Sequence, residues 1–433
     1  RDGIASRGLG DVYKRQKSWP SWEDALNTAH CPISANGASN TDLARRRLAF
    51  DELFSHQLSL SIARNKIKGS KGRANISTGI MQTNVLKQLS FDFTEDQKHS
   101  IKDILDDLKK PERMNRLLQG DVGSGKTIVA FIGIIAAVEA GGQGAIMAPT
   151  EILARQHFET LSPLAKKVGV SLNLLTGRDK GTARNKKLID LKEGKTNIII
   201  GTHALFQADV VFKDLRLAVV DEQHRFGVRQ RLELGKKGSV VDLLLMTATP
   251  IPRSLALAHY GDMDFSIIKQ KPPGRKPINT ALISSSRIDE VVDKLKNSLA
   301  KGAQAYWVCP LIEESEVLHY TAAERRFEKL RAKLGEGVVE LVHGKMSSDT
   351  KDEIMDRFTN GETKLLVATT VIEVGVNVPK ANIMVVENAE KFGLAQLHQL
   401  RGRVGRGTNQ STCLFLYKEP LNSSSKKRLS ILR

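Results

Sequence analysis

The chain has 433 residues, a formal net charge of +18 and a pI near 9.7. At about 100–200 residues per domain, this length predicts two or three domains. Hydrophobic residues make up 40% of the chain, which excludes a largely disordered protein. The longest apolar run, 128–138, is shorter than the about 20 residues that cross a bilayer, so we expect no membrane partner. Three distant cysteines make both a disulfide framework and a structural zinc site unexpected.

The surplus of positive charge lies at the two ends of the chain. Residues 1–90 contribute +7, residues 401–433 contribute +7, and the long middle, 91–400, contributes only +4. Such a surplus favours a polyanionic partner such as nucleic acid, but basic runs are also common on solvated surfaces. Charge alone leaves both interpretations open.

The first ninety residues carry little regular pattern. Residues 1–16 lack periodicity, and we interpret them as a non-native leader. A helix is predicted over Thr41 to Arg64, because Phe50, Phe54 and Leu58 fall on one stripe. The stretch 65–90 is interpreted as a linker.

From Phe91 onward, short β-branched runs alternate with helical stretches, which predicts parallel sheets flanked by helices. A Pro- and Gly-rich segment, 271–277, divides this region. We therefore predict two tandem α/β domains, 91–272 and 273–433, and find no internal sequence repeat. The expected strands are Gly144–Met147, Asn197–Ile200, Leu217–Val220, Asp242–Met246, Ala305–Val308, Val338–Val342, Lys364–Ala368, Ile383–Val386 and Cys413–Tyr417.

A phosphate-binding loop is predicted at 120–127, where the sequence GDVGSGKT follows a short apolar strand and opens an apolar helix. Gly120, Gly123, Ser124 and Gly125 would let backbone N–H groups surround the phosphates of ATP. Lys126 would neutralise the phosphates, and the Thr127 hydroxyl would bind Mg²⁺. The predicted cofactors are therefore ATP and Mg²⁺.

Two carboxylates end another predicted strand. Asp221 and Glu222 follow an apolar run, at the sheet edge where α/β proteins bind ligands. Asp221 is a candidate ligand of Mg²⁺, and Glu222 is a candidate base for the attacking water. An ordinary strand-end turn is the alternative, which the presence of Lys126 in the same domain disfavours.

Gln97 has two interpretations. With Thr94 it fits a capping box at a helix start. Its amide could also contact adenine, with Phe91 nearby for stacking.

These motifs, in this order, resemble the motor core of superfamily 2 helicases, and more narrowly a bacterial family of helicases that act on branched DNA. The stretches that carry the resemblance are 116–127, 147–154, 221–228, 246–253, 305–314 and 397–406. The resemblance implies two RecA-like domains, adenine recognition by Gln97, and ATP hydrolysis coupled to movement on DNA. It implies DNA-backbone contacts at Thr150, Arg155, Thr202, His203 and Thr369, nucleotide contact at Gly375, coupling roles for Thr247, Thr249 and Gln399, and arginine fingers at Arg403 and Arg406.

The resemblance also implies a monomer in the bacterial cytoplasm, associated with the nucleoid and acting in recombination and repair. Residues 17–90 would be the remnant of an N-terminal wedge domain and its linker, and the chain would be a fragment that lacks most of this domain and a C-terminal segment. Alternatives are a transcription-coupled repair translocase, an RNA helicase, or a nucleic-acid-binding module without ATPase activity.

Overall fold

The computed structural model forms two compact units, Arg1–Ser70 with Ile251–Asp264, and Lys71–Pro250 with Phe265–Arg433. No helix in the part of the chain that is described is long and apolar enough to span a membrane. The structure describes residues 19–31, 38–68, 72–222, 237, 240–248, 263–270, 272, 276–310, 316–369, 378, 380–405 and 410–432.

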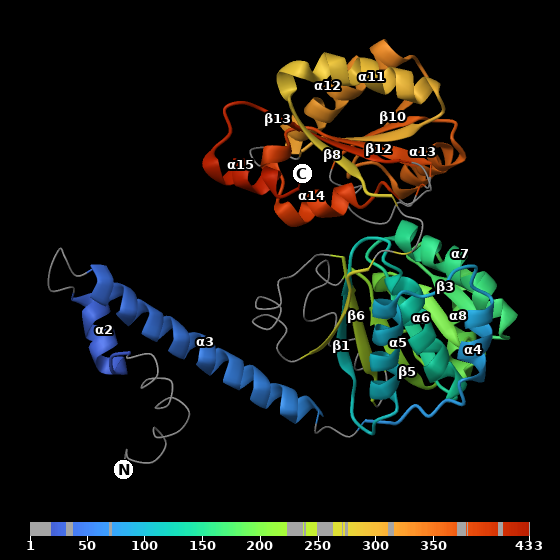
Figure 1. The fold of residues 1–433 in the computed structure, drawn as a ribbon. Coiled ribbons are helices and arrows are strands. Elements are labelled where there is room, and N and C mark those ends of the chain that lie inside the picture. The colour runs from blue at the N-terminus through green and yellow to red at the C-terminus, as the bar shows by residue number, and fades with distance from the viewer. Residues whose placement is uncertain are drawn as a thin grey trace. The chain divides into compact units, whose positions relative to one another are not determined.

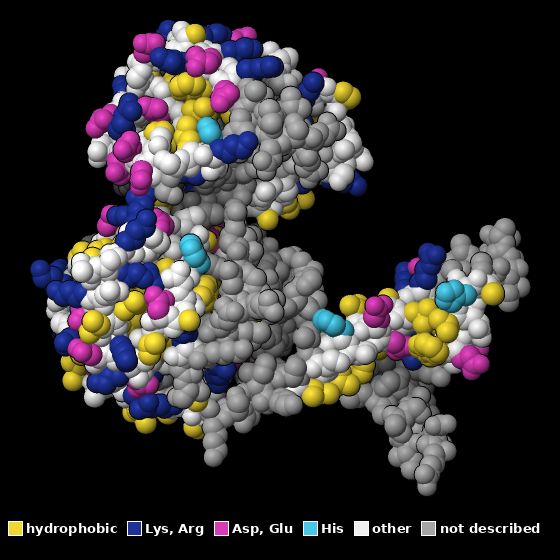
Figure 2. All heavy atoms as spheres, turned by 180° about the vertical axis from the view of Figure 1, so that it is seen from behind, with side chains coloured by type: hydrophobic (Ala, Val, Ile, Leu, Met, Phe, Trp, Pro, Cys, Tyr) yellow, Lys and Arg dark blue, Asp and Glu magenta, His cyan; other side chains and the backbone are white. Residues whose placement is uncertain are grey.

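The first unit contains two helices, α2 (Trp22–His30) and α3 (Ala38–Lys68), the second of which extends beyond the predicted helix at both ends. Phe50 of α3 lies against Trp19, with ring centroids 5.0 Å apart, and stacks on Phe54 at 5.8 Å. Leu58 and Ile62 are exposed further along α3. Figure 2 shows hydrophobic side chains on the surface of this first unit.

The second unit holds two α/β domains, which confirms the predicted fold class (Figure 1). The first has a seven-stranded sheet in the order β3-β4-β2-β5-β6-β1-β7. Its elements are α4 (Ile80–Lys87), α5 (Glu95–Leu108), β1 (Asn115–Gly120), α6 (Lys126–Glu139), β2 (Gln143–Met147), α7 (Glu151–Lys167), β3 (Leu172–Leu175), α8 (Gly181–Glu193), β4 (Ile198–Gly201), η1 (His203–Phe206), β5 (Leu215–Val220), β6 (Asp242–Thr247) and β7 (Asp264–Ile268).

The second α/β domain has a six-stranded sheet in the order β10-β11-β9-β12-β13-β8, and its paired strands are parallel. Its elements are β8 (Asn279–Ser284), η3 (Ser285–Arg287), α11 (Ile288–Ala300), β9 (Gln304–Val308), α12 (Glu316–Leu334), β10 (Val339–Val342), α13 (Ser348–Asn360), β11 (Leu365–Ala368), β12 (Ala381–Val386), η5 (Ala389–Lys391), α14 (Leu394–Arg401), β13 (Thr412–Tyr417) and α15 (Ser423–Ser430).

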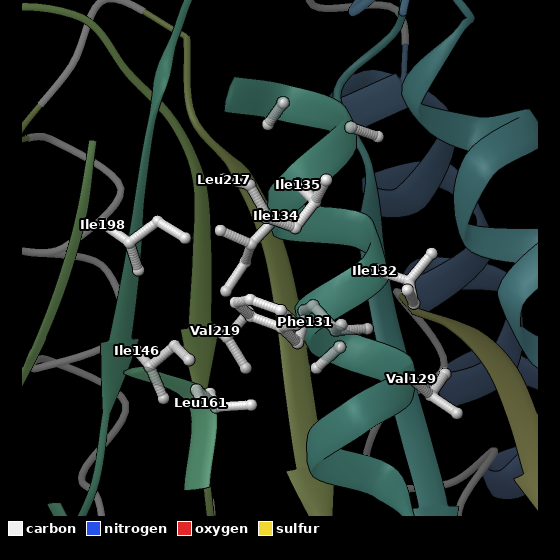
Figure 3. Packing of buried hydrophobic residues seen from close by; sticks show 14 of the residues in the cluster. Val129, Phe131, Ile132, Ile134, Ile135, Ile146, Leu161, Ile198, Leu217 and Val219 are labelled. Atoms are coloured by element: carbon white, nitrogen blue, oxygen red, sulfur yellow. The ribbon is translucent and has the colours of Figure 1, made fainter. Parts of the chain in front are cut away.

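Helix α6 forms the centre of the first domain's core. Phe131 and Ile134 point toward the strands, among them Ile146 and Val219, whereas Ile132 projects from the other side of the helix (Figure 3). A helix that is apolar on all sides must be covered on all sides, and α6 is buried along most of its length. This packing fixes the loop that precedes α6.

Residues 72–90 contact the first α/β domain, although the sequence suggests a linker there. The Asn75 backbone N–H donates to the Leu108 carbonyl at 2.7 Å. Glu139, the last residue of α6, accepts hydrogen bonds from the backbone N–H groups of Ile80 and Met81 at 2.9 and 3.1 Å, which caps α4. The segment therefore belongs to this domain.

Asp242, at the start of β6, connects the same segment to the sheet. Its carboxylate accepts from the Asn75 side-chain amide at 2.9 Å and from the Met114 backbone N–H at 2.8 Å. Burial raises the pKa of Asp242 to about 7. The folded protein therefore binds this proton more tightly than the unfolded chain does.

We expect Asp242 to make stability depend on pH. Its contribution is complete below about pH 4, the pKa in unfolded chains, and is lost as the pH rises through 7. The whole effect is at most on the order of 4 kcal/mol, at about 1.4 kcal/mol per pKa unit. Asp242→Asn, which stays neutral, should gain stability relative to the wild type between pH 5 and pH 8, as measured by urea unfolding. Parallel pH profiles for the two proteins would contradict this expectation.

The second sheet repeats the first strand by strand, because β8 to β13 follow the same spatial order as β1 to β6. Gln143 and Gln304 open the equivalent strands β2 and β9, and each side-chain amide donates to two backbone carbonyls. The equivalent strands β5 and β12 are each followed by an acidic residue and then by a residue with positive φ, Glu222 (+48°) or Asn388 (+49°). The two domains are thus copies of one fold with divergent sequences.

Glu387, the acidic residue after β12, forms hydrogen bonds with helix α12. Glu387 accepts from Arg326 Nε at 2.8 Å, from Arg326 Nη2 at 2.6 Å and from Trp307 Nε1 at 3.0 Å. We expect Glu387→Gln to lower the free energy of unfolding by about 2 kcal/mol, because it weakens hydrogen bonds to a charged group. A urea unfolding midpoint equal to that of the wild type would show that this cluster adds little stability.

Candidate active site

The loop between β1 and α6 has a backbone suited to binding an anion. Gly123 and Gly125 have φ of +77° and +89°, a conformation that favours glycine. Gly125 caps α6 without a side-chain hydrogen bond, so the first N–H groups of the helix are available to a ligand. Ser124 Oγ is buried and has no hydrogen-bond partner among the described residues. These groups fit the phosphates of a nucleotide.

Lys126 and Thr127 begin α6. The Lys126 ammonium is buried and donates to the carbonyls of Gly120 and Asp121 at 2.6 and 3.0 Å. Burial lowers the pKa of Lys126, and the negative charge of Glu222 opposes this shift. Thr127 is half-buried in the first helical turn. The lysine charge therefore lies at the loop, where a phosphate would be held.

Gln97 supports this loop. Its Oε1 accepts from the Thr94 backbone N–H at 2.9 Å, and the Thr94 hydroxyl accepts from the Gln97 N–H, which confirms the capping box. Its Nε2 donates to the Ser124 carbonyl at 2.7 Å. A Cβ atom at Gly125 would lie 2.4 Å from this Nε2, so the loop glycine permits the contact. The adenine contact stays a prediction.

Asp221 follows β5 and is buried. Its Oδ2 lies 2.8 Å from His157 Nε2, and its Oδ1 accepts from the Glu222 backbone N–H at 2.9 Å. Burial alone would raise the pKa of Asp221, but the hydrogen bond and charge of His157, together with the charge of Lys126 and the Glu222 backbone N–H, lower the pKa. Asp221 is therefore a carboxylate, the form that binds a divalent cation.

Glu222 is buried beside Asp221, and it differs from Asp221 in its proton affinity. Burial, and then the charge of Asp221, raise the pKa of Glu222. A carboxylate with a raised pKa is a stronger base, as proton abstraction from water requires. The two neighbouring acids are thus suited to different tasks, with Asp221 as a cation ligand and Glu222 as a base.

Arg403 adds a positive charge to this group. It lies two residues beyond α14 and is 4% exposed, and its charge acts on both Lys126 and Glu222. A Cβ atom at the neighbouring Gly402 would lie 2.9 Å from Val122 Cβ, so this turn lies against the phosphate loop. The structure thus brings together Lys126, Asp221, Glu222 and Arg403.

The predicted DNA-contacting residues differ in exposure. Arg155 and His203 are exposed on α7 and η1. The Thr150 hydroxyl caps α7 by accepting from the Leu153 N–H at 3.3 Å. Thr202 and Thr369, by contrast, are 2% exposed, and the Thr202 hydroxyl has no hydrogen-bond partner among the described residues.

The remaining predicted residues are either buried or lie outside the described part of the chain. Thr247 ends β6 with no exposed surface, and Gln399 of α14 is 4% exposed. Thr249, Gly375 and Arg406 lie outside the residues that the structure describes. On the face that Figure 2 shows, Lys and Arg side chains are interspersed with Asp and Glu, so charge does not mark an interface there.

His157 was not predicted from the sequence. It lies on the buried side of α7 with Ala154, Leu161 and Ala165. An imidazole within an otherwise apolar stripe of a helix could have drawn attention to it, because a buried polar group requires a partner.

Family comparisons agree with this geometry. Residues 94–257 match the family of DEAD/DEAH box helicases, and residues 287–408 match the helicase conserved C-terminal domain. Fold and site thus define a superfamily 2 helicase with two RecA-like domains. A yeast protein of this fold, Dbp5 bound to RNA and ADP BeF3, has a TM-score of 0.60 at 16% identity and covers 83% of this chain and 91% of its own.

More similar relatives specify the family. The chain is 49% identical over 396 residues to the ATP-dependent DNA helicase RecG of Haemophilus influenzae, and 44% identical over 419 residues to RecG of Escherichia coli O157:H7. A structure of RecG bound to a three-way DNA junction superposes with a TM-score of 0.78 at 42% identity, covering 90% of this chain and 51% of that one. This chain belongs to the RecG family. The matches include 90% and 95% of this chain, but only 57% and 60% of the length of those two curated relatives.

Proposed function

We propose that the chain is an ATP-dependent DNA helicase that acts on branched DNA in recombination and repair. The observation that carries this proposal is the convergence of Lys126, Asp221, Glu222 and Arg403 on one phosphate-binding loop. The identity with RecG proteins, one of them solved on a three-way DNA junction, supports DNA as the substrate.

Each residue of the site has a distinct task in hydrolysis. Mg²⁺ held by Thr127 and Asp221 would supply positive charge to the terminal phosphates. Glu222 takes a proton from water as the water oxygen bonds to the γ-phosphorus and the bond from phosphorus to the β–γ bridging oxygen breaks. Lys126 and Arg403 stabilise the negative charge on the γ-phosphoryl oxygens.

DNA would bind at the exposed side of the first domain. Arg155 and His203 offer side chains to the phosphate backbone, and the O–H of Thr150 can donate while its oxygen caps α7. Thr202 and Thr369 could contribute only after a rearrangement that exposes them, since both are buried. Backbone contacts of this kind predict binding that tolerates sequence and weakens with salt.

We further propose that the chain acts as a monomer in the bacterial cytoplasm, in association with the nucleoid. Gln97 contacts adenine in this proposal, and Thr247, Thr249 and Gln399 couple nucleotide state to the bound strand. Gly375 and Arg406 would complete the nucleotide site. The bacterial sources of the relatives support the location.

The experiment that tests the function compares ATP hydrolysis without nucleic acid and with duplex DNA, single-stranded DNA, a three-way junction and RNA. The proposal predicts the strongest stimulation with the junction. Stronger stimulation by RNA would favour an RNA helicase, and strongest stimulation by plain duplex would favour a duplex translocase such as those of transcription-coupled repair. Turnover that is unchanged in Glu222→Gln would favour a binding module without ATPase activity.

A further inference from the structure

The contact between His157 and Asp221 joins helix α7 to the nucleotide site. Both residues are 6% exposed, and His157 Nε2 lies 2.8 Å from Asp221 Oδ2. The other oxygen, Oδ1, accepts the Glu222 backbone N–H at 2.9 Å. The Asp221 carboxylate is thus oriented by one side chain and one backbone group.

Helix α7 carries the proposed DNA contacts at its other side. Thr150 caps its first turn, and Arg155 is exposed only two residues before the buried His157. A helix moves as a rigid element, so a shift of Arg155 on a DNA backbone also shifts His157. Asp221 would then be displaced through a single hydrogen bond.

The second domain shows what a different partner does to the equivalent carboxylate. Glu387 follows β12 as Asp221 follows β5, and each backbone N–H donates to the end of the neighbouring strand at 2.8 Å. Glu387 accepts four side-chain hydrogen bonds, two of them from the Arg326 guanidinium and one each from Trp307 Nε1 and Cys309 Sγ. An ionised carboxylate has about four lone-pair positions, so these donors occupy most of them.

An imidazole occupies fewer lone pairs of the carboxylate than a guanidinium does, so more of them remain available to a cation. His157 supplies one hydrogen bond to Asp221, whereas a guanidinium would supply two together with a permanent charge that competes with a cation. The choice of histidine in the first domain therefore suits a carboxylate that must also bind a metal ion.

We propose that His157 is a positioning residue, which holds Asp221 in the orientation that binds Mg²⁺ and links this site to DNA bound along α7. The proposal rests on the proposed function for its DNA part. Its metal part concerns only nucleotide binding, and can be tested without hydrolysis.

The test uses His157→Gln and His157→Arg. Glutamine can place an amide donor near the position of Nε2, and arginine reproduces the partner found in the second domain. The first measurement is the dissociation constant of a fluorescent ADP analogue with and without Mg²⁺. We expect the gain in affinity caused by Mg²⁺ to be largely kept in His157→Gln and to fall by about ten- to hundredfold in His157→Arg.

The second measurement is the ratio of ATP hydrolysis rates with and without three-way-junction DNA. We expect this ratio to be reduced in His157→Arg and largely kept in His157→Gln. Arg155→Gln is the matched control, because it should weaken DNA binding, measured by fluorescence anisotropy, while leaving the Mg²⁺ effect on ADP affinity unchanged.

Equal behaviour of the two His157 variants, whether both match the wild type or both lose the Mg²⁺ effect, would overturn the proposal. Misfolded molecules do not bind the ADP analogue, so the Mg²⁺ effect reports only on folded protein. A wild-type chain without DNA-stimulated hydrolysis would contradict the proposed function, while the Mg²⁺ effect would still decide the role of His157.

Discussion

The Glu222→Gln protein is expected to bind ATP about as tightly as the wild type and to hydrolyse it about 10²–10⁴-fold more slowly. Glutamine keeps the shape of the side chain in the buried site but cannot take a proton from water. Nucleotide binding depends instead on the phosphate loop and Lys126, which this substitution leaves in place. Single-turnover hydrolysis and equilibrium binding of a fluorescent nucleotide measure the two quantities separately.

The pH dependence of hydrolysis provides a second readout of Glu222. Burial and the charge of Asp221 raise the pKa of Glu222. The wild-type rate should therefore fall on acidification at a pH above the ordinary range of glutamic acid, because protonated Glu222 cannot act as a base. The residual activity of Glu222→Gln should lack this acidic limb. A Glu222→Gln protein with the wild-type rate and pH profile would show that Glu222 is not the base in hydrolysis.

Arg403→Ala is expected to lower the rate of hydrolysis by about 10³-fold, the lower end of the range for arginine fingers. Arg403→Lys should recover only part of this loss, because a lysine lacks the planar, forked guanidinium. The charge of Arg403 also lowers the pKa of Glu222, so its removal should move the acidic limb of the residual activity to higher pH.

Arg401→Lys is the matched control for this experiment. Arg401 lies in the same segment, but its guanidinium donates to the Leu432 carbonyl at 3.0 Å, a contact within the second domain. Its substitution should leave hydrolysis close to the wild-type rate. Equal losses in the Arg401 and Arg403 variants would point to a general disturbance of the segment rather than to stabilisation of the transition state.

The buried strands could be predicted from the sequence because they are continuous apolar runs. β4 and β5 are buried at every residue, and both were expected within two residues of their bounds. The strands β3, β7 and β8 were not predicted. They lie at sheet edges and are only partly buried, so their sequences lack such runs.

The site was predictable where it depends on local motifs and less so where it depends on packing. The phosphate loop is one contiguous segment, and Asp221 and Glu222 are adjacent residues. The structure places the loop and this pair together. The role of His157 could not be predicted from a local motif, because its partner Asp221 is 64 residues away in the sequence. The two tandem α/β domains were expected from the sequence, but the equivalence of single positions was not, since Asp221 and Glu387 keep their place in the topology but not their sequence context.

Whether this site couples ATP hydrolysis to DNA binding is measured by the steady-state rate of ATP hydrolysis with and without three-way-junction DNA. We expect a rate that rises with the DNA concentration to a plateau in the wild type, with no comparable rise in Glu222→Gln. A wild-type rate that is the same with and without the junction, at a DNA concentration where binding is complete, would contradict this expectation.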